Sequence, residues 1–270
     1  MRYRYILILF VLFLSSCEER VDWDLESENI TILVVDGMIT NEQKHQRVIL
    51  TKPVMGLNEK PEPVSGALVA ISDGDVVYIL TEDNRNPGVY LTDSTVRGEI
   101  GKAYYLYIKI GNEEFTGHDY MTAVEPLKPF LYHKVQGYEN LYEMYYNESR
   151  DPSMMHVYFN WSYLVDPAER ATAMAFVHYY SLKSIDVNEL FKPDQERVFF
   201  PAGTVVLRKK YSLSYAHQVF IRSMMMETEW KGGVFDVMPA NVISNITGRA
   251  VGFFSASAIV SDTIIVQSIQ

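Results

Sequence analysis

The chain has 270 residues, of which 48% are hydrophobic, and a formal net charge of −10. This length accommodates one large domain or two of ordinary size. An acidic chain without a cluster of Lys and Arg does not suit nucleic acid, whose phosphates require concentrated positive charge, and does not suit adsorption to anionic lipid either. We therefore expect no nucleic-acid partner.

The first residues have the order of charge, apolar core and small residues that is typical of a secretory signal. Arg2 and Arg4 precede an apolar run from Ile6 to Leu14, and the sequence Leu14-Ser15-Ser16-Cys17 follows. The apolar run is shorter than the ~20 residues that a membrane-spanning helix needs. We predict a signal peptide over residues 1–16 and lipid attachment at Cys17, the only cysteine. Stable anchoring requires more than one acyl chain, so we expect several, with palmitate among them.

Residues 17–29 are polar and acidic, and predict a short tether between the lipid and the folded body. Acidic residues directly after a lipidated cysteine resemble the surface-export tether of Bacteroidetes lipoproteins. Only Glu18 and Glu19 provide this charge before Arg20. We expect a location on the outer membrane, with the cell surface preferred and the periplasmic side left open.

The segment from residue 30 to residue 125 predicts a β-sandwich of the immunoglobulin or transthyretin type. Short runs of β-forming residues alternate with turn signals every ~8–12 residues, and no helical period appears before Thr122. Asp36-Gly37 is expected to end the first strand. The expected strands are Ile30–Val35, Arg47–Thr51, Gly66–Ile71, Val76–Thr81, Val89–Leu91, Ala103–Ile110 and Glu113–Thr116.

A boundary is expected near residue 125, because Pro126 and Pro129 cannot continue a central strand. Residues 126–270 predict a second, β-rich α+β domain with one long helix, which begins at Ser212 or Ser214 and ends near Trp230. The other expected elements are strands at Met155–Tyr163, Ala171–Leu182, Gly203–Lys209, Gly248–Val260 and Thr263–Ile269, with a turn at Ser261-Asp262, and a short helix from Asp186 to Phe191. The fold class is thus mainly β with some α.

Several stretches, in this order behind the cysteine, resemble the DUF4249 family of Bacteroidetes outer-membrane lipoproteins. They are Val34–Thr40, Val64–Ile71, Gly88–Tyr90, Gly101–Leu106, Gly233–Asp236, Asn241, Ser244–Ile246 and Ala250–Phe254. The resemblance implies no activity, since the family's function is unknown. Because its members are often encoded beside TonB-dependent receptors, it implies an accessory of an uptake system. The N-terminal half is also similar to transthyretin-like and carboxypeptidase-regulatory sandwiches, a likeness of fold that does not imply function.

No catalytic or metal-binding motif appears in the sequence. The six histidines are scattered singly, and none has the spacing of a metal site. There is no G-x-S-x-G elbow, P-loop or G-x-G-x-x-G motif. We expect no enzyme activity, no cofactor and no metal, with a hydrolase assembled from distant loops as the remaining enzymatic alternative.

Two groups of residues are candidates for contact with a ligand or partner. The first is a tyrosine-rich segment that includes Tyr142, Tyr145 and Tyr146, whose rings offer apolar area with a polar tip for a sugar or peptide. Packing of the second half on the sandwich is the preferred alternative for these tyrosines. The second group comprises Asp236, Asn241 and Asn245, which follow the long helix; capping of their own turns is preferred there.

These observations favour a non-catalytic lipoprotein of the cell envelope that assists a TonB-dependent transporter by binding its substrate or the receptor. A structural or adhesive surface module is the alternative, with the sandwich as a spacer. The sequence does not identify the ligand.

Overall fold

The computed structural model describes residues 32–54, 56, 58–146, 149–182, 197–228 and 242–269. The predicted signal peptide and tether, with Cys17, lie outside the described residues. So do the predicted helix Asp186–Phe191 and the candidates Asp236 and Asn241. No helix in the described part of the chain is both long and apolar enough to cross a membrane.

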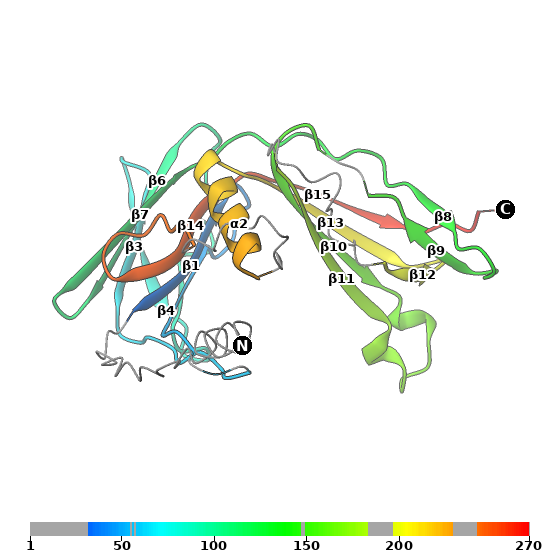
Figure 1. Cartoon of the computed structure of the whole chain (residues 1–270), viewed down its shortest axis with the longest axis horizontal. Helices are drawn as coiled ribbons and strands as arrows, with labels where there is room; N and C mark the ends of the chain where they lie inside the picture. Colours follow the sequence, from blue (N-terminus) through cyan, green and yellow to red (C-terminus); the bar gives the residue numbers. More distant parts are fainter. Residues whose placement is uncertain are drawn as a thin grey trace, which may run out of the picture. The chain divides into compact units, whose positions relative to one another are not determined.

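Eight strands form the first sheet, in the order β14-β1-β2-β5-β4-β3-β6-β7 (Figure 1). Their bounds are β1 Leu33–Thr40, β2 Arg47–Thr51, β3 Leu68–Ser72, β4 Val77–Glu82, β5 Val89–Leu91, β6 Ala103–Ile110, β7 Glu113–Tyr120 and β14 Ala250–Ser257. The strands predicted before residue 122 are all present, and those at Arg47–Thr51, Val89–Leu91 and Ala103–Ile110 have the predicted bounds.

The two edge strands of this sheet, β7 and β14, pack against each other and are linked by a side-chain hydrogen bond, and β7 also contacts the segment that precedes β14. The Asp119 Oδ2 atom accepts a hydrogen bond from the Ala256 backbone at 2.9 Å, and residues 117 and 246 form an isolated bridge. The enclosed core consists of alternate residues from the strands, among them Val35, Ile39, Leu50, Ile71, Tyr104, Leu106, Ile108 and Phe254. The result is the predicted sandwich.

The last strand of this sandwich comes from beyond the predicted boundary at residue 125. β14 pairs in parallel with β1, with Leu33 opposite Ala250 and Thr40 opposite Ser257. By their contacts, residues 32–270 form one compact unit. The predicted division into residues 30–125 and 126–270 therefore assigns β14 to the second domain, although this strand belongs to the first sheet.

Two predicted turns are instead parts of strands. Asp36 and Gly37 lie in the middle of β1, where β2 pairs on one side and β14 on the other. Ser261 and Asp262 lie within β15, Ile259–Ile265, and the chain passes from β14 to β15 at Ala258. Pairing with distant strands outweighs the local preference of Asp-Gly and Ser-Asp for turns.

The other strands form two smaller sheets around a second core. One sheet has the order β11-β10-β13-β15 and the other the order β12-β9-β8. Buried Val157, Phe159, Val206, Phe200 and Tyr142 lie in this second core. The bounds are β8 Tyr132–Lys134, β9 Leu141–Met144, β10 Ser153–Asn160, β11 Met174–Ser181, β12 Phe199–Pro201 and β13 Val205–Ser212. Two short 3-10 helices lie between β10 and β11, at Ser162–Leu164 and Arg170–Thr172.

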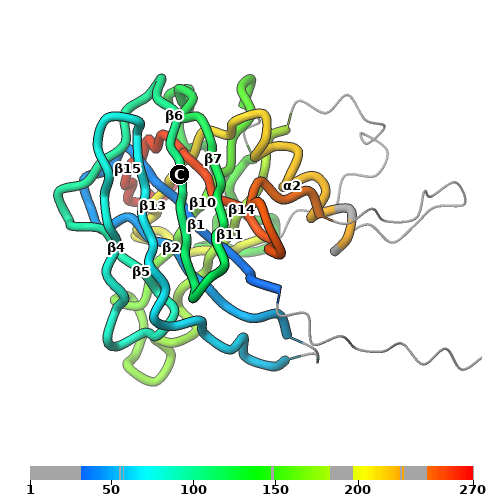
Figure 2. Tube along the Cα trace, turned by 90° about the vertical axis from the view of Figure 1, so that its left-hand side faces the viewer, coloured from blue at the N-terminus to red at the C-terminus, as the bar shows by residue number. Residues whose placement is uncertain are grey.

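The predicted long helix is α2, Tyr215–Thr228. Ser214 caps it, since the Ser214 Oγ atom accepts a hydrogen bond from the His217 backbone at 3.0 Å. Phe220 and His217 stack on Phe253 of β14, with ring centroids 4.9 Å and 4.8 Å away, and α2 lies beside β14 (Figure 2). The helix thus covers one face of the sandwich.

Gly252 is the position in β14 where a side chain is least tolerable. Its φ is +111°, and a Cβ atom there would lie 1.9 Å from the carbonyl oxygen of Val35 in the paired strand. We predict that Gly252→Ala lowers the free energy of unfolding by about 3 kcal/mol or more, because β14 and β1 must separate. Urea unfolding measures the change. Val251→Ala is the control, an exposed neighbour with an expected loss below about 1 kcal/mol; equal losses would contradict the prediction.

His217 predicts a dependence of stability on pH. Its side chain is buried against Phe253, and burial lowers its pKa to about 4. The unfolded chain therefore binds a proton more readily than the folded chain between about pH 6.5 and pH 4, and stability falls as the pH drops through this window.

Between about pH 7.5 and about pH 5, the free energy of unfolding of the unsubstituted protein should decrease because the unfolded chain binds a proton at His217. We predict that this decrease is about 2 kcal/mol smaller in His217→Phe. Urea unfolding at the two pH values measures this difference. Tyr215→Phe, an exposed substitution on the same helix, should keep the original dependence. An unchanged pH dependence in His217→Phe would refute the assignment.

Candidate binding surface

The structure separates the three candidate tyrosines. Tyr142 is buried in the second core, where its hydroxyl accepts a hydrogen bond from the Ile269 backbone at 3.1 Å. Tyr145 is exposed, and its ring lies 4.6 Å from that of His133. Tyr146 packs against Tyr179 at 5.2 Å. These rings form no common stacking surface. Tyr142 lies in the second core and Tyr146 packs against it, whereas the sequence favoured packing of the second half on the sandwich.

Asn245 joins two strands of the sandwich. Its Nδ2 atom donates hydrogen bonds to the carbonyl oxygens of His118, at 2.9 Å, and Phe254, at 2.7 Å. Its Oδ1 atom accepts a hydrogen bond from the Phe254 backbone at 2.9 Å. The amide therefore bonds to the backbones of β7 and β14, whereas the sequence analysis preferred a contact with its own turn.

The structure instead exposes rings on one face of the sheet β11-β10-β13-β15. Successive side chains of a strand point to opposite faces. In the register of this sheet, His156 lies opposite His178 and Tyr158 lies opposite Phe176. We call His156, Tyr158, Phe176 and His178 the aromatic face.

The rings of the aromatic face contact one another; Tyr158, Phe176 and His178 are exposed, whereas His156 is half-buried. The centroids of Tyr158 and Phe176 are 4.6 Å apart, and those of His156 and Phe176 are 5.3 Å apart. Tyr158 and Phe176 are 41% and 44% exposed. Large apolar side chains gathered on an exposed surface mark candidate interaction sites.

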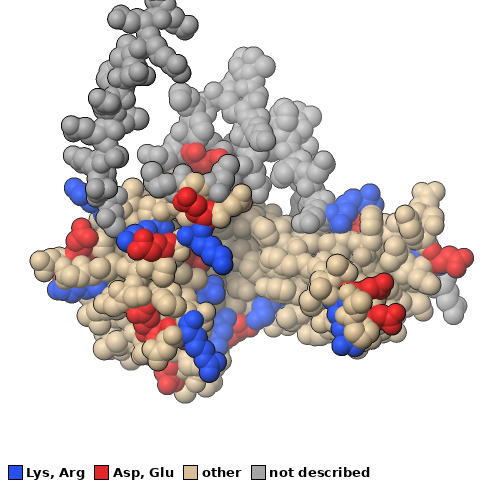
Figure 3. Space-filling view, turned by 90° about the horizontal axis from the view of Figure 1, so that it is seen from below, with Lys and Arg blue, Asp and Glu red and all other residues tan. Residues whose placement is uncertain are grey.

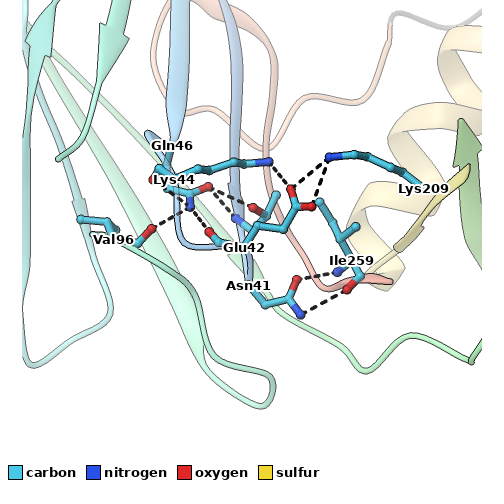
Figure 4. Close-up of polar contacts among 8 residues, drawn as sticks. Asn41, Glu42, Lys44, Gln46, Val96, Lys209 and Ile259 are labelled. Atoms are coloured by element: carbon cyan, nitrogen blue, oxygen red, sulfur yellow. Dashed lines mark hydrogen bonds and ion pairs between the residues drawn. The ribbon is translucent and has the colours of Figure 1, made fainter. Parts of the chain in front are cut away.

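The aromatic face meets one ion pair at its border. Burial, with the charges of His178 and Lys209 as smaller causes, lowers the pKa of His156 to about 4, so His156 is neutral at pH 7. Lys209 is opposite His156 in the register, and its Nζ atom lies 3.1 Å from Glu42 Oε1 (Figure 4). A partner of this surface would therefore meet a neutral His156 beside a lysine that is paired with a carboxylate.

The same ion pair belongs to a polar junction between the β1–β2 connection and the second sheet (Figure 4). The Asn41 Oδ1 atom accepts a hydrogen bond from the Ile259 backbone at 2.6 Å, and Glu42 also pairs with Lys44 at 2.7 Å. Gln46 braces the connection, since its Oε1 accepts from the Thr40 backbone at 2.9 Å. The junction fixes the connection that carries Glu42.

The aromatic face ends at β11, an edge strand among the described strands of its sheet. β11 pairs with β10 on one side, and no other described strand pairs with it. Its sequence, Met174–Ser181 (MAFVHYYS), contains no proline and no Lys, Arg, Asp or Glu. Edge strands of soluble proteins usually carry charge or proline that prevents further pairing. β11 can therefore accept an additional strand.

Within the described ranges, no group of three or more His, Cys, Asp or Glu side chains is arranged to hold a metal ion. The sequence alone does not show that His156 and His178 are neighbours, because they are 22 positions apart and meet only through strand pairing. A signal was present, since β10 alternates apolar Val157 and Phe159 with His156 and Tyr158.

The comparisons with known proteins identify the family. The model of the family described as "Domain of unknown function (DUF4249)" matches residues 18–263. The chain belongs to this family. No curated protein matches the sequence.

One solved structure that matches is the crystal structure of chicken CNTN1 FN1-FN3 domains. It has 9% sequence identity and a TM-score of 0.28, and the match covers 68% of this chain. The chain spans 62% of the length of that structure. This slight likeness carries no argument about function.

Proposed function

We propose that this member of the DUF4249 family is a non-catalytic, lipid-anchored protein of the bacterial outer membrane that assists a TonB-dependent transporter. It does so by pairing an extended segment of the receptor with the edge of β11. The observation that carries the proposal is the edge strand β11, which contains no Lys, Arg, Asp or Glu and lies beside the aromatic face.

An added strand gains affinity from main-chain hydrogen bonds and specificity from alternate side chains. β11 offers eight residues for such pairing. Of its outward side chains, Met174 and Phe176 are 54% and 44% exposed, and would contact every second residue of the partner. An extended peptide satisfies both features, whereas a sugar would use the rings alone.

Three observations support the anchored location. Arg2, Arg4 and the apolar run before Cys17 have the order of a secretory signal. The family match begins at residue 18, directly after that cysteine. On the face shown in Figure 3, acidic and basic side chains lie interspersed and form no basic stripe, which supports attachment through lipid rather than through charge.

Substitution of Cys17 tests the anchor. We predict that Cys17→Ala abolishes incorporation of labelled fatty acid and leaves the protein uncleaved or soluble, because the acylated thiol is lost. Radiolabelled palmitate and membrane fractionation measure the two effects. Ser16→Ala, which keeps a small residue before the cysteine, is the control and should remain lipidated. Continued acylation of Cys17→Ala would refute the anchor.

Affinity purification from outer membranes tests receptor docking. We predict that the unsubstituted protein co-purifies a β-barrel receptor and that Phe176→Lys reduces its recovery roughly tenfold, because a charge at the edge blocks strand addition. Quantitative mass spectrometry measures the recovery, and thermal unfolding verifies that the variant is folded.

Ile265→Lys is the matched control, since Ile265 is an exposed apolar residue of β15, the opposite edge of the same sheet. It should leave the recovery unchanged. Absence of any receptor, or equal recovery with Phe176→Lys, would contradict the proposal. Recovery of other copies of this chain alone would favour the structural or adhesive alternative.

A further inference from the structure

The face of the sheet β11-β10-β13-β15 that lies opposite the aromatic face changes from apolar to polar along the strands. Its rows follow from the register. One row holds Ala175, Phe159 and Val206, which lie in or against the second core. Two rows further, the side chains are Tyr179, Met155 and Lys210, and the next row holds Ser181, Ser153 and Ser212.

A small open depression lies at the polar end of this face. Residues of β10, β11 and β13 form its floor, and Lys128 and Ser149 from the neighbouring loops complete it. Its polar lining includes Lys128, Ser153, Tyr179, Ser181, Arg208 and Lys210. The lining combines three cations with hydroxyl groups and contains no carboxylate.

Two of these cations are withdrawn from water. The side chains of Lys210 and Arg208 are only 3% and 7% exposed. Burial of a charge is costly unless the charge is paired and hydrogen-bonded. Each has a carboxylate partner at the border of the depression. Lys210 Nζ lies 3.3 Å from Glu125 Oε2. Arg208 donates hydrogen bonds from Nε and Nη2 to the two carboxylate oxygens of Asp262.

These ion pairs do not use all the N–H donors of Lys210 and Arg208. An ammonium group has three N–H donors and a guanidinium group has five. The pair with Glu125 uses one oxygen of that carboxylate, which Ser149 Oγ also contacts at 2.9 Å. The fork to Asp262 uses two of the five donors of Arg208. Burial raises the pKa of Tyr179 to about 12, so its hydroxyl stays protonated and able to donate.

Converging cations and hydroxyl donors recognise an oxyanion. We propose that this depression binds the carboxylate or phosphate group of a small anionic ligand, with Lys210 and Arg208 as its charged contacts and Ser153 and Tyr179 as hydroxyl donors. The site lies on the face of the sheet opposite the aromatic face. Two of its lining residues, Tyr179 and Ser181, belong to β11, but they alternate with Phe176 and His178 and face the other side of the sheet. Anion binding and receptor docking can therefore each fail in their own test without the other.

Calorimetric titration of the purified, detergent-solubilised lipoprotein at constant ionic strength tests the site. Inorganic phosphate and citrate are the two probes, and they distinguish a phosphate source from a carboxylate source. We expect saturable binding of at least one probe, and none of glucose. Lys210→Met should weaken that binding at least about tenfold, whereas Lys210→Arg should retain most of it.

Lys209→Met is the matched control, because Lys209 is adjacent on β13 and points to the opposite face. It should bind the probe like the unsubstituted protein. Ser153→Ala removes only a hydroxyl and provides a second test if Lys210→Met does not fold; it should weaken binding several-fold. Absence of binding of both probes, or equal weakening by Lys209→Met and Lys210→Met, would overturn the proposal.

Discussion

The backbone of Ala258 and Ile259 is where the chain leaves the sandwich and enters the second sheet, and hydrogen bonds hold it from both sides. Ser212 Oγ accepts a hydrogen bond from the Ala258 backbone at 2.9 Å, and the Ser212 backbone donates one to the Ala258 carbonyl at 2.9 Å. Asn41, from the β1–β2 connection, accepts from Ile259 at 2.6 Å. Because Ala258 is fully buried, this crossing has no water to replace a lost partner. The strand before this crossing, β14, belongs to the eight-stranded sheet, and the strand after it, β15, belongs to the sheet β11-β10-β13-β15. Both sheets therefore depend on the hydrogen bonds of Ala258 and Ile259.

The crossing also gives the second sheet its two chemically distinct faces. Once Ile259 pairs with Tyr211, the register of β13 is set, and Lys209 and Lys210 point to opposite sides. A slip of one residue would exchange them, with Lys210 on the aromatic face and Lys209 on the face that carries the depression. The separation of a docking edge without Lys, Arg, Asp or Glu from a cationic depression is thus a consequence of strand pairing, and both proposed sites rely on it.

Local patterns predicted the strands well and their partners poorly. Alternation in Ala103–Ile110 and turn residues around Val89–Leu91 gave the observed bounds, because these strands pair with near neighbours in sequence or are bounded by strong turns. The turn expected at Asp36-Gly37 fails because β1 is paired on both sides, once with a strand more than 200 residues away. Gly37 serves packing instead, since a Cβ atom there would lie 3.0 Å from the Phe254 ring. The exposed rings and the buried cations escaped prediction for the same reason, because both arise only when distant strands are brought into register.

The buried cations are costly features of this fold unless they have a use. Apolar residues of similar volume in place of buried charged groups are often neutral or stabilising, and only the cations of these two pairs are buried, since Glu125 and Asp262 are partly exposed. Stability alone therefore does not explain Lys210 and Arg208. The neighbouring rows of the same face show the alternative, since Phe159, Val206 and Ala175 fill their positions without charge. The guanidinium of Arg208 also lies over the Phe130 ring, 5.4 Å from its centroid, and this cation–π contact helps to hold it in place. A cation that is fixed by an aromatic ring and a carboxylate fork is pre-organised, and an incoming oxyanion would not have to order it. That geometry suits recognition of a ligand better than it suits the filling of a core.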